Sequence, residues 1–114
     1  MLDPAAIERL QQLDPTGERG FVVQVLRTYE ASLRRYVEAM VGARAAAQVM
    51  PVGEAAHTLK SSSAAVGAML LSAHCAEVER LARAGDGAAL GEPLTRLLDE
   101  AARVRVAVRA MLPA

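Results

Sequence analysis

The stretch FVVQVLRTYEASLRRYVEAM, residues 21–40, decides the fold of this chain. Its apolar side chains recur every three or four residues, which is the spacing of one face of an α-helix. The residues on that face are Phe21, Val25, Leu26, Tyr29, Leu33, Tyr36, Val37 and Met40, and charged residues such as Arg27, Glu30, Arg34 and Arg35 lie off it. The pattern predicts a long amphipathic helix over residues 18–42, and such a helix must bury its apolar face against other helices.

Further helices are predicted on both sides of this one. Asp3 and Pro4 are typical of a helix start and predict a short helix over about 4–13, closed by the turn sequence at 14–17. A third helix is predicted from about 48–50 to 66, with Pro51 in its first turn. A fourth is predicted over 68–84, followed by Gly85 as the residue that ends it. The last is predicted from 88 or 92 to 112.

The lengths of these segments and of their connections indicate the architecture. Short loops make consecutive helices antiparallel neighbours, so we expect an all-α protein, an up-down antiparallel four-helix bundle with a short extra N-terminal helix. The chain has 114 residues, of which 53% are apolar and only 3% aromatic. A chain of this size fits a single domain spanning residues 1–114.

Composition excludes several classes of function. Thirteen basic and thirteen acidic side chains balance to zero net charge, which argues against a nucleic-acid partner. No apolar run is long enough to span a membrane, and the N-terminal residues lack the pattern of a signal peptide, so we expect a cytoplasmic protein with no membrane partner. The one cysteine, Cys75, excludes an internal disulfide and a cysteine-rich zinc site. We expect it to be a small buried side chain, and we expect no metal site in this chain.

The segment AAHTLKSSSAAVGA, residues 55–68, carries the functional signal. On a helical wheel, one side holds the core positions Val52, Ala56, Leu59, Ser63 and Val66. His57 lies on the opposite side among four small residues, Gly53, Ser61, Ala64 and Ala68, which leave an open patch where a partner could approach the ring. Lys60 lies one turn further on. A neutral imidazole is a nucleophile that can accept a phosphoryl group, and the chain lacks a glycine-rich nucleotide-binding loop that would supply one.

The same segment resembles the signature of histidine-containing phosphotransfer (HPt) domains, roughly A-H-x-L-K-G-S-S-x-x-hydrophobic-G. The matching residues are Ala56, His57, Leu59, Lys60, Ser62, Ser63, Val66 and Gly67. Ser61 departs from the pattern, because the family usually has glycine there. The order of the helices along the whole chain is also similar to that of the family.

The resemblance implies a phosphorelay intermediate. His57 would accept a phosphoryl group from an aspartyl phosphate of a receiver domain and pass it to another receiver aspartate, and Lys60 would neutralise charge on the phosphoryl oxygens. Family members also use residues on the following helix, for which Glu79 and Arg83 are the candidates. The chain would bind no cofactor, would have no kinase activity of its own, and would rely on the receiver for Mg²⁺. The implied partners are response-regulator receiver domains and a hybrid sensor histidine kinase. The resemblance also implies that the chain is a monomer.

Two other functions fit the same residues. One is a non-catalytic helical adaptor or dimerisation module, in which His57 is only exposed to solvent. The other is the phosphotransfer domain of a chemotaxis-type kinase, which would receive its phosphoryl group from a kinase domain. The three serines at 61–63 could be nucleophiles, but we expect Ser62 and Ser63 to lie toward the core and bond to backbone carbonyls. We interpret Arg103, Arg105 and Arg109 as a solvated helix face.

Overall fold

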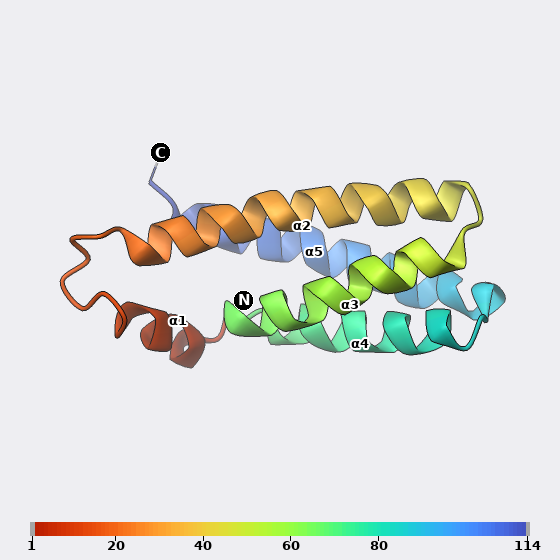
Figure 1. The fold of residues 1–114 in the computed structure, drawn as a ribbon, viewed down its shortest axis with the longest axis horizontal. Coiled ribbons are helices and arrows are strands. Elements are labelled where there is room, and N and C mark those ends of the chain that lie inside the picture. Colours follow the sequence, from red (N-terminus) through yellow and green to blue (C-terminus); the bar gives the residue numbers. More distant parts are fainter. Residues whose placement is uncertain (1, 114) are drawn as a thin grey trace.

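A computed structural model describes residues 2–113, and within them the chain forms five α-helices, one 3₁₀ turn and no strand. The helices are α1 (Pro4–Gln11), α2 (Phe21–Ala45), α3 (Val49–Ala65), α4 (Met69–Arg83) and α5 (Gly91–Met111), with the 3₁₀ turn η1 (Gly87–Leu90) before α5. Figure 1 shows α2 to α5 lying along the long axis of the molecule in alternating directions, with the short α1 at one end. The predicted all-α bundle with an extra N-terminal helix is confirmed.

The largest differences from the predicted helix ends concern α2, which spans 21–45 instead of 18–42. It starts later because the Asp14 carboxylate accepts hydrogen bonds from the backbone N–H groups of Arg19 and Phe21 and so holds residues 14–20 as a turn. Gly42 lies inside the helix, and the chain reverses only at Ala47, which has a φ of 54°. The other predicted ends lie within three residues of the observed ones; α1 starts at Pro4 as predicted and stops at Gln11.

The α3–α4 connection requires glycine at position 67. Gly67 has a φ of +85°, and its carbonyl accepts a hydrogen bond of 2.8 Å from the N–H of Asp3. A Cβ at this position would lie 2.7 Å from the Asp3 nitrogen, which is closer than real contacts allow. The N-terminal segment therefore rests directly on the turn that follows the histidine helix, and buried Ile7 of α1 joins the core there.

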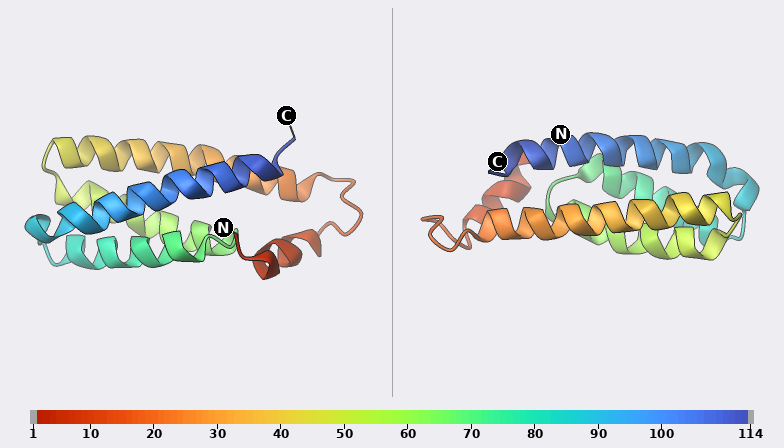
Figure 2. Two further views of the ribbon diagram at one scale, coloured as in Figure 1. Left: turned by 180° about the vertical axis from the view of Figure 1, so that it is seen from behind. Right: turned by 90° about the horizontal axis from the view of Figure 1, so that it is seen from above.

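Helix α3 is held in the bundle by a close backbone approach and by a buried polar pair. A Cβ on Gly53 would lie 2.8 Å from the Cβ of Ala82, so α3 and α4 approach closely at this level. On the other side of α3, the hydroxyl groups of Tyr29 and Ser63 lie 2.8 Å apart in a buried hydrogen bond to α2. Together these contacts fix which side of α3 faces α4 and which faces α2 (Figure 2).

The core is built from the apolar faces that the sequence predicts. Its fully buried side chains come from all four long helices, as Leu33, Leu59, Val78 and Val104 illustrate. Cys75 is also fully buried, as expected, and burial raises the pKa of its thiol to about 12. None of the helices in residues 2–113 combines the length and apolar character needed to cross a bilayer.

Candidate functional site

His57 projects from the middle of α3 toward α4, and its side chain is 59% exposed. Beneath it lies Glu79 of α4, a carboxylate that is almost completely buried, with a side-chain exposure of 6%. An isolated buried carboxylate is strongly disfavoured, so the surroundings of Glu79 must supply compensating donors. They do so from three directions.

Three cationic or potentially cationic groups surround the Glu79 carboxylate. His57 Nδ1 lies 2.6 Å from Oε2, and the guanidinium of Arg83 contacts the same oxygen at 2.7 Å. The Lys60 ammonium donates to Oε1 at 2.7 Å. The hydrogen bond from Lys60 is the largest cause that lowers the pKa of Glu79, and the contacts with His57 and Arg83 add to it against the opposing effect of burial. Glu79 is therefore ionised at neutral pH.

The ionised state of Glu79 determines the tautomer of His57. A carboxylate without its proton can only accept hydrogen bonds, so Nδ1 of His57 must carry the proton in their 2.6 Å contact. In the neutral ring the other nitrogen, Nε2, then keeps its lone pair. Because the side chain is more than half exposed, this arrangement presents an oriented nucleophilic nitrogen to solvent.

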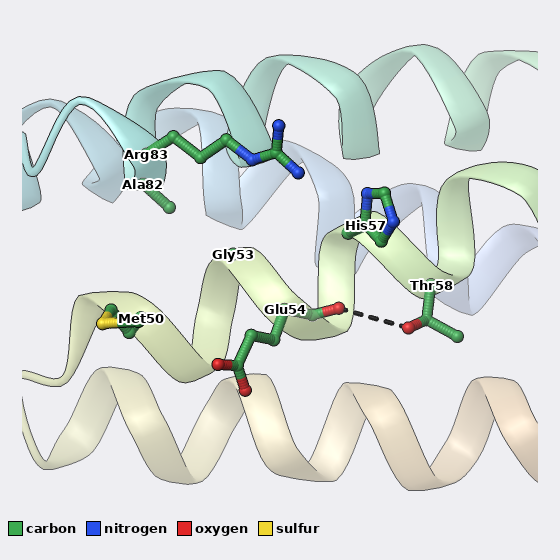
Figure 3. Close-up of a pocket in the computed structure, with 7 residues that line it drawn as sticks. All are labelled: Met50, Gly53, Glu54, His57, Thr58, Ala82 and Arg83. Atoms are coloured by element: carbon green, nitrogen blue, oxygen red, sulfur yellow. Dashed lines mark hydrogen bonds between the residues drawn. The ribbon is translucent and has the colours of Figure 1, made fainter.

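Lys60 and Arg83 contact the same carboxylate as His57 but differ in accessibility. The Lys60 side chain is 38% exposed and that of Arg83 is 70% exposed. Both are long side chains whose charged ends can move while their stems stay in place. Figure 3 shows the Arg83 guanidinium reaching from α4 toward the His57 ring on α3.

A cavity of about 560 Å³ opens beside His57, between α3 and α4. It is lined by Met50, Gly53, Glu54, His57, Thr58, Ala82 and Arg83 (Figure 3). Met50 and Glu54 were not among the residues singled out from the sequence. They precede His57 by seven and three positions, so the same helical spacing that groups His57 with Lys60 could have identified them. Met50 is 72% exposed, which makes it a large apolar group at the edge of this cavity.

Two of the four small residues expected in the open patch around His57 are buried instead. Ala68 is 1% exposed because α3 ends at Ala65, so the helical wheel does not extend to residue 68, which precedes α4. Gly53 is buried against Ala82 and lines the floor of the cavity. Ser61 is exposed and Ala64 is half-buried, as the expected patch requires.

Several of the serines and arginines named from the sequence pair with other groups of the bundle. Ser62 donates to the backbone carbonyls of Thr58 and Leu59, as expected, whereas Ser63 bonds to Tyr29. Arg103 pairs with Glu100 and Arg109 with Glu30. Within residues 2–113 no group of three or more His, Cys, Asp or Glu side chains is arranged to hold a metal ion.

Comparison with known proteins adds two findings. A family model described as "Hpt domain" matches residues 24–107. The fold is similar to the crystal structure of histidine-containing phosphotransfer protein B (HptB) from Pseudomonas aeruginosa PAO1, with a TM-score of 0.85 over 96% of this chain and 91% of that chain, at 24% sequence identity. The comparison with curated proteins found no match.

Proposed function

Because this chain belongs to the Hpt domain family and therefore has a phosphotransfer role in phosphorelays, we propose that His57 is its phosphoacceptor. The phosphoryl group comes from the aspartyl phosphate of one receiver domain and passes on to the aspartate of another. The observation that carries this proposal is the contact of 2.6 Å between His57 Nδ1 and the ionised carboxylate of Glu79. In the neutral ring that contact places the proton on Nδ1, so that Nε2 is unprotonated and accessible, as a nucleophile for phosphorus must be.

The chemical step needs no general base on this chain. Nε2 attacks phosphorus, a P–N bond forms, and the P–O bond to the receiver aspartate breaks, so that the aspartate leaves as a carboxylate. No proton has to be removed, because Nε2 carries none. The ring becomes positively charged, and the Glu79 carboxylate at Nδ1 stabilises that charge through a charge-assisted hydrogen bond. The reverse step returns the phosphoryl group to a receiver aspartate by the same path.

Lys60 and Arg83 are proposed to stabilise the phosphoryl oxygens during transfer. In the free protein both cations pair with Glu79, close to the ring that is to be phosphorylated. Phosphoryl transfer depends chiefly on positioning and on stabilising charge at the oxygens of the transferred group. An ammonium has three N–H donors and a guanidinium has five, so each can keep one bond to Glu79 while it donates to a phosphoryl oxygen.

The cavity beside His57 is proposed to receive an apolar side chain of the docking receiver. Met50 provides an exposed apolar edge, and Gly53 and Ala82 keep the floor open. Ser61 and Ala64 extend the same docking surface, and the buried residues Ala68 and Gly53 support it from beneath. The partners proposed are response-regulator receiver domains and a hybrid sensor histidine kinase. In this proposal the receiver supplies the Mg²⁺, and the chain binds no cofactor.

The complete proposal is a cytoplasmic phosphocarrier that acts as a monomer and a single domain, without kinase activity of its own. Its test is transfer from a panel of phosphorylated receiver domains to the full chain, with His57→Gln as the defining variant. His74→Gln on α4 is the matched control, because it removes the other histidine of the chain by the same substitution. We expect an acid-labile, base-stable label on the wild type and on His74→Gln, and none on His57→Gln.

Two outcomes would contradict the proposal. Label that survives in His57→Gln would place the phosphoacceptor elsewhere. An absence of label from every receiver in the panel, with a helical and cooperatively folded protein, would favour a non-catalytic helical adaptor or dimerisation module. The position of the phosphoryl group on the ring, which ³¹P NMR distinguishes, should be Nε2; attachment at Nδ1 would contradict the role given to Glu79.

A further inference from the structure

A second groove runs along the opposite side of the bundle from His57, between α2 and α5. In the bundle α3 and α4 form one face and α2 and α5 the other (Figure 2), and the groove between α2 and α5 encloses about 470 Å³. Its floor is apolar and contains Leu33, Val37, Leu98 and Ala101, of which Leu33 and Ala101 are almost fully buried. At its rim stands Val106, which is 70% exposed although it is a large apolar residue.

The rim of this groove is basic in a protein whose net charge is zero. Three arginines, Arg34, Arg105 and Arg109, line it against a single acidic residue, Glu38. Arg109 is paired with Glu30, but Arg34 and Arg105 form no ion pair with any side chain in residues 2–113. The Nε of Arg105 is also buried without a hydrogen-bond partner within the same residues. Two guanidinium groups beside an apolar groove can therefore pair with the anions of a partner.

We infer that this groove binds an acidic amphipathic helix of a partner protein. The apolar floor fits the apolar stripe of such a helix, and Arg34 and Arg105 fit carboxylates that flank the stripe. The lining residues of α5 extend from Leu98 to Arg109, about 16 Å at the rise of an α-helix, which matches about three turns of a bound helix.

The shape of the groove favours a helix over a membrane surface. The accessible apolar surface of the groove lies between two helices, on the half-buried Val37 and Leu98, and a flat lipid surface would reach mainly the rim. Charge complementarity favours a separate acidic partner over a second copy of this chain, since a copy would bring its own basic rim against the first. The two faces are also independent. A helix bound between α2 and α5 leaves the α3–α4 face, with His57, free for other contacts.

The binding test uses a synthetic 14-residue peptide with leucines at helical spacing and flanking glutamates, carrying a fluorescent label. The control peptide has every glutamate replaced by lysine. Both are titrated with the full chain by fluorescence anisotropy, and the contacted residues are mapped by amide chemical shifts. We expect saturable binding of the acidic peptide only, shifts on α2 and α5, and weakening as salt is raised.

Three variants locate the binding surface. Val106→Glu places a negative charge at the apolar rim and should weaken binding by at least about tenfold. Arg34→Gln combined with Arg105→Gln removes the two unpaired cations and should weaken it by about three- to tenfold. Arg27→Gln, on an exposed position of α2 outside the groove, should have no effect.

Several results would overturn the inference. Equal binding of the acidic and basic peptides, or no saturable binding of either, would exclude an acidic helix as the ligand. Chemical shifts confined to the His57 face would place the peptide elsewhere. Self-association that Val106→Glu abolishes would assign the groove to a second copy. Binding to phosphatidylglycerol vesicles that requires Arg34 and Arg105 would assign it to a lipid surface.

Discussion

Glu79→Gln is the substitution that tests the proposed role of the carboxylate most directly, because it removes the charge and keeps the shape. Glu79 is buried and contacts His57, Lys60 and Arg83 within 2.7 Å. A hydrogen bond to a charged group contributes roughly 1.5–3 kcal/mol, against about 1 kcal/mol for a neutral pair. The difference of about 0.5–2 kcal/mol applies when the ring becomes positive during transfer. At about 1.4 kcal/mol for each factor of ten, transfer should slow by about 2- to 30-fold.

The assay is single-turnover transfer from a phosphorylated receiver to the chain, followed by the rate of label appearing on His57. Glu77→Gln is the matched control on the same helix. Its side chain is 48% exposed and pairs with Arg80 at the surface, so it should change the rate by less than about twofold. Denaturant unfolding of both variants checks that the bundle remains folded. We expect Glu79→Gln to remain folded, because the partly exposed side chains of Lys60 and Arg83 can turn toward solvent when the carboxylate is lost.

A clear result would refute this reasoning. If Glu79→Gln transfers as fast as Glu77→Gln, the negative charge of Glu79 does not stabilise the positive ring. If instead Glu79→Gln abolishes transfer and also unfolds the bundle, the rate cannot be interpreted, and Glu79→Asp becomes the discriminating variant. It keeps the charge but shortens the side chain, so a folded Glu79→Asp protein with the wild-type rate would also contradict the geometric argument.

Three further predictions concern stability, and each is measured by urea unfolding. Gly67→Ala should destabilise the protein by about 1–2 kcal/mol or more, because the positive φ strains any other residue and the new Cβ would collide with Asp3; an unchanged midpoint would show that the turn relaxes easily. Tyr29→Phe should lower the free energy of unfolding by about 1–2 kcal/mol, since it leaves the buried Ser63 hydroxyl without its partner, and Tyr29→Phe combined with Ser63→Ala should recover part of that loss. The lowered pKa of Glu79 means that the unfolded chain takes up this proton at a higher pH than the folded one, so stability should fall as pH drops below the ordinary glutamate value of about 4.3. Glu79→Gln should lose less stability than the wild type over that interval, and identical pH profiles would contradict this.

The helices could be predicted from the sequence because each buries a continuous apolar face. Leu33 and Leu59 lie where their periodicity places them, fully buried. The ends of α2 were less predictable. Gly42 weakens a helix locally but does not stop it when the flanking residues pack, and the start depends on Asp14 reaching across seven positions to Phe21. A hydrogen bond between residues seven positions apart in a turn produces no periodic pattern in the sequence.

Only the part of the candidate site that lies on a single helix could be predicted from the sequence. His57 and Lys60 share a face because they are three residues apart, and the helical wheel is reliable along α3. It fails at Ala68, beyond the end of that helix. The contact of both residues with Glu79 depends on how α3 and α4 are aligned, and Gly53 fixes that alignment through its close approach to Ala82. Residue spacing cannot supply the distance between two helices.

The close packing around Gly53 changes how the docking surface should be probed. A bulky residue at Gly53 cannot probe docking alone, because its Cβ would already collide with Ala82 and would separate α3 from α4. Because Glu79 reaches His57 and Lys60 across the same interface, such a variant would lose transfer through a displaced carboxylate as well as through blocked docking. Ala64 is half-buried at the surface and is the better position for added bulk.

The arrangement of charge around Glu79 suits the phosphorylated state proposed for this protein. In the free protein one carboxylate faces two permanent cations, Lys60 and Arg83, so these three groups carry a net positive charge beside the ring. A phosphoryl group on His57 brings about two negative charges, while the ring itself becomes positive. The five groups then balance to zero. Because both cations are held close to the ring before the phosphoryl group arrives, little reorganisation is needed when its charge develops, and this is the condition under which electrostatic stabilisation accelerates transfer most.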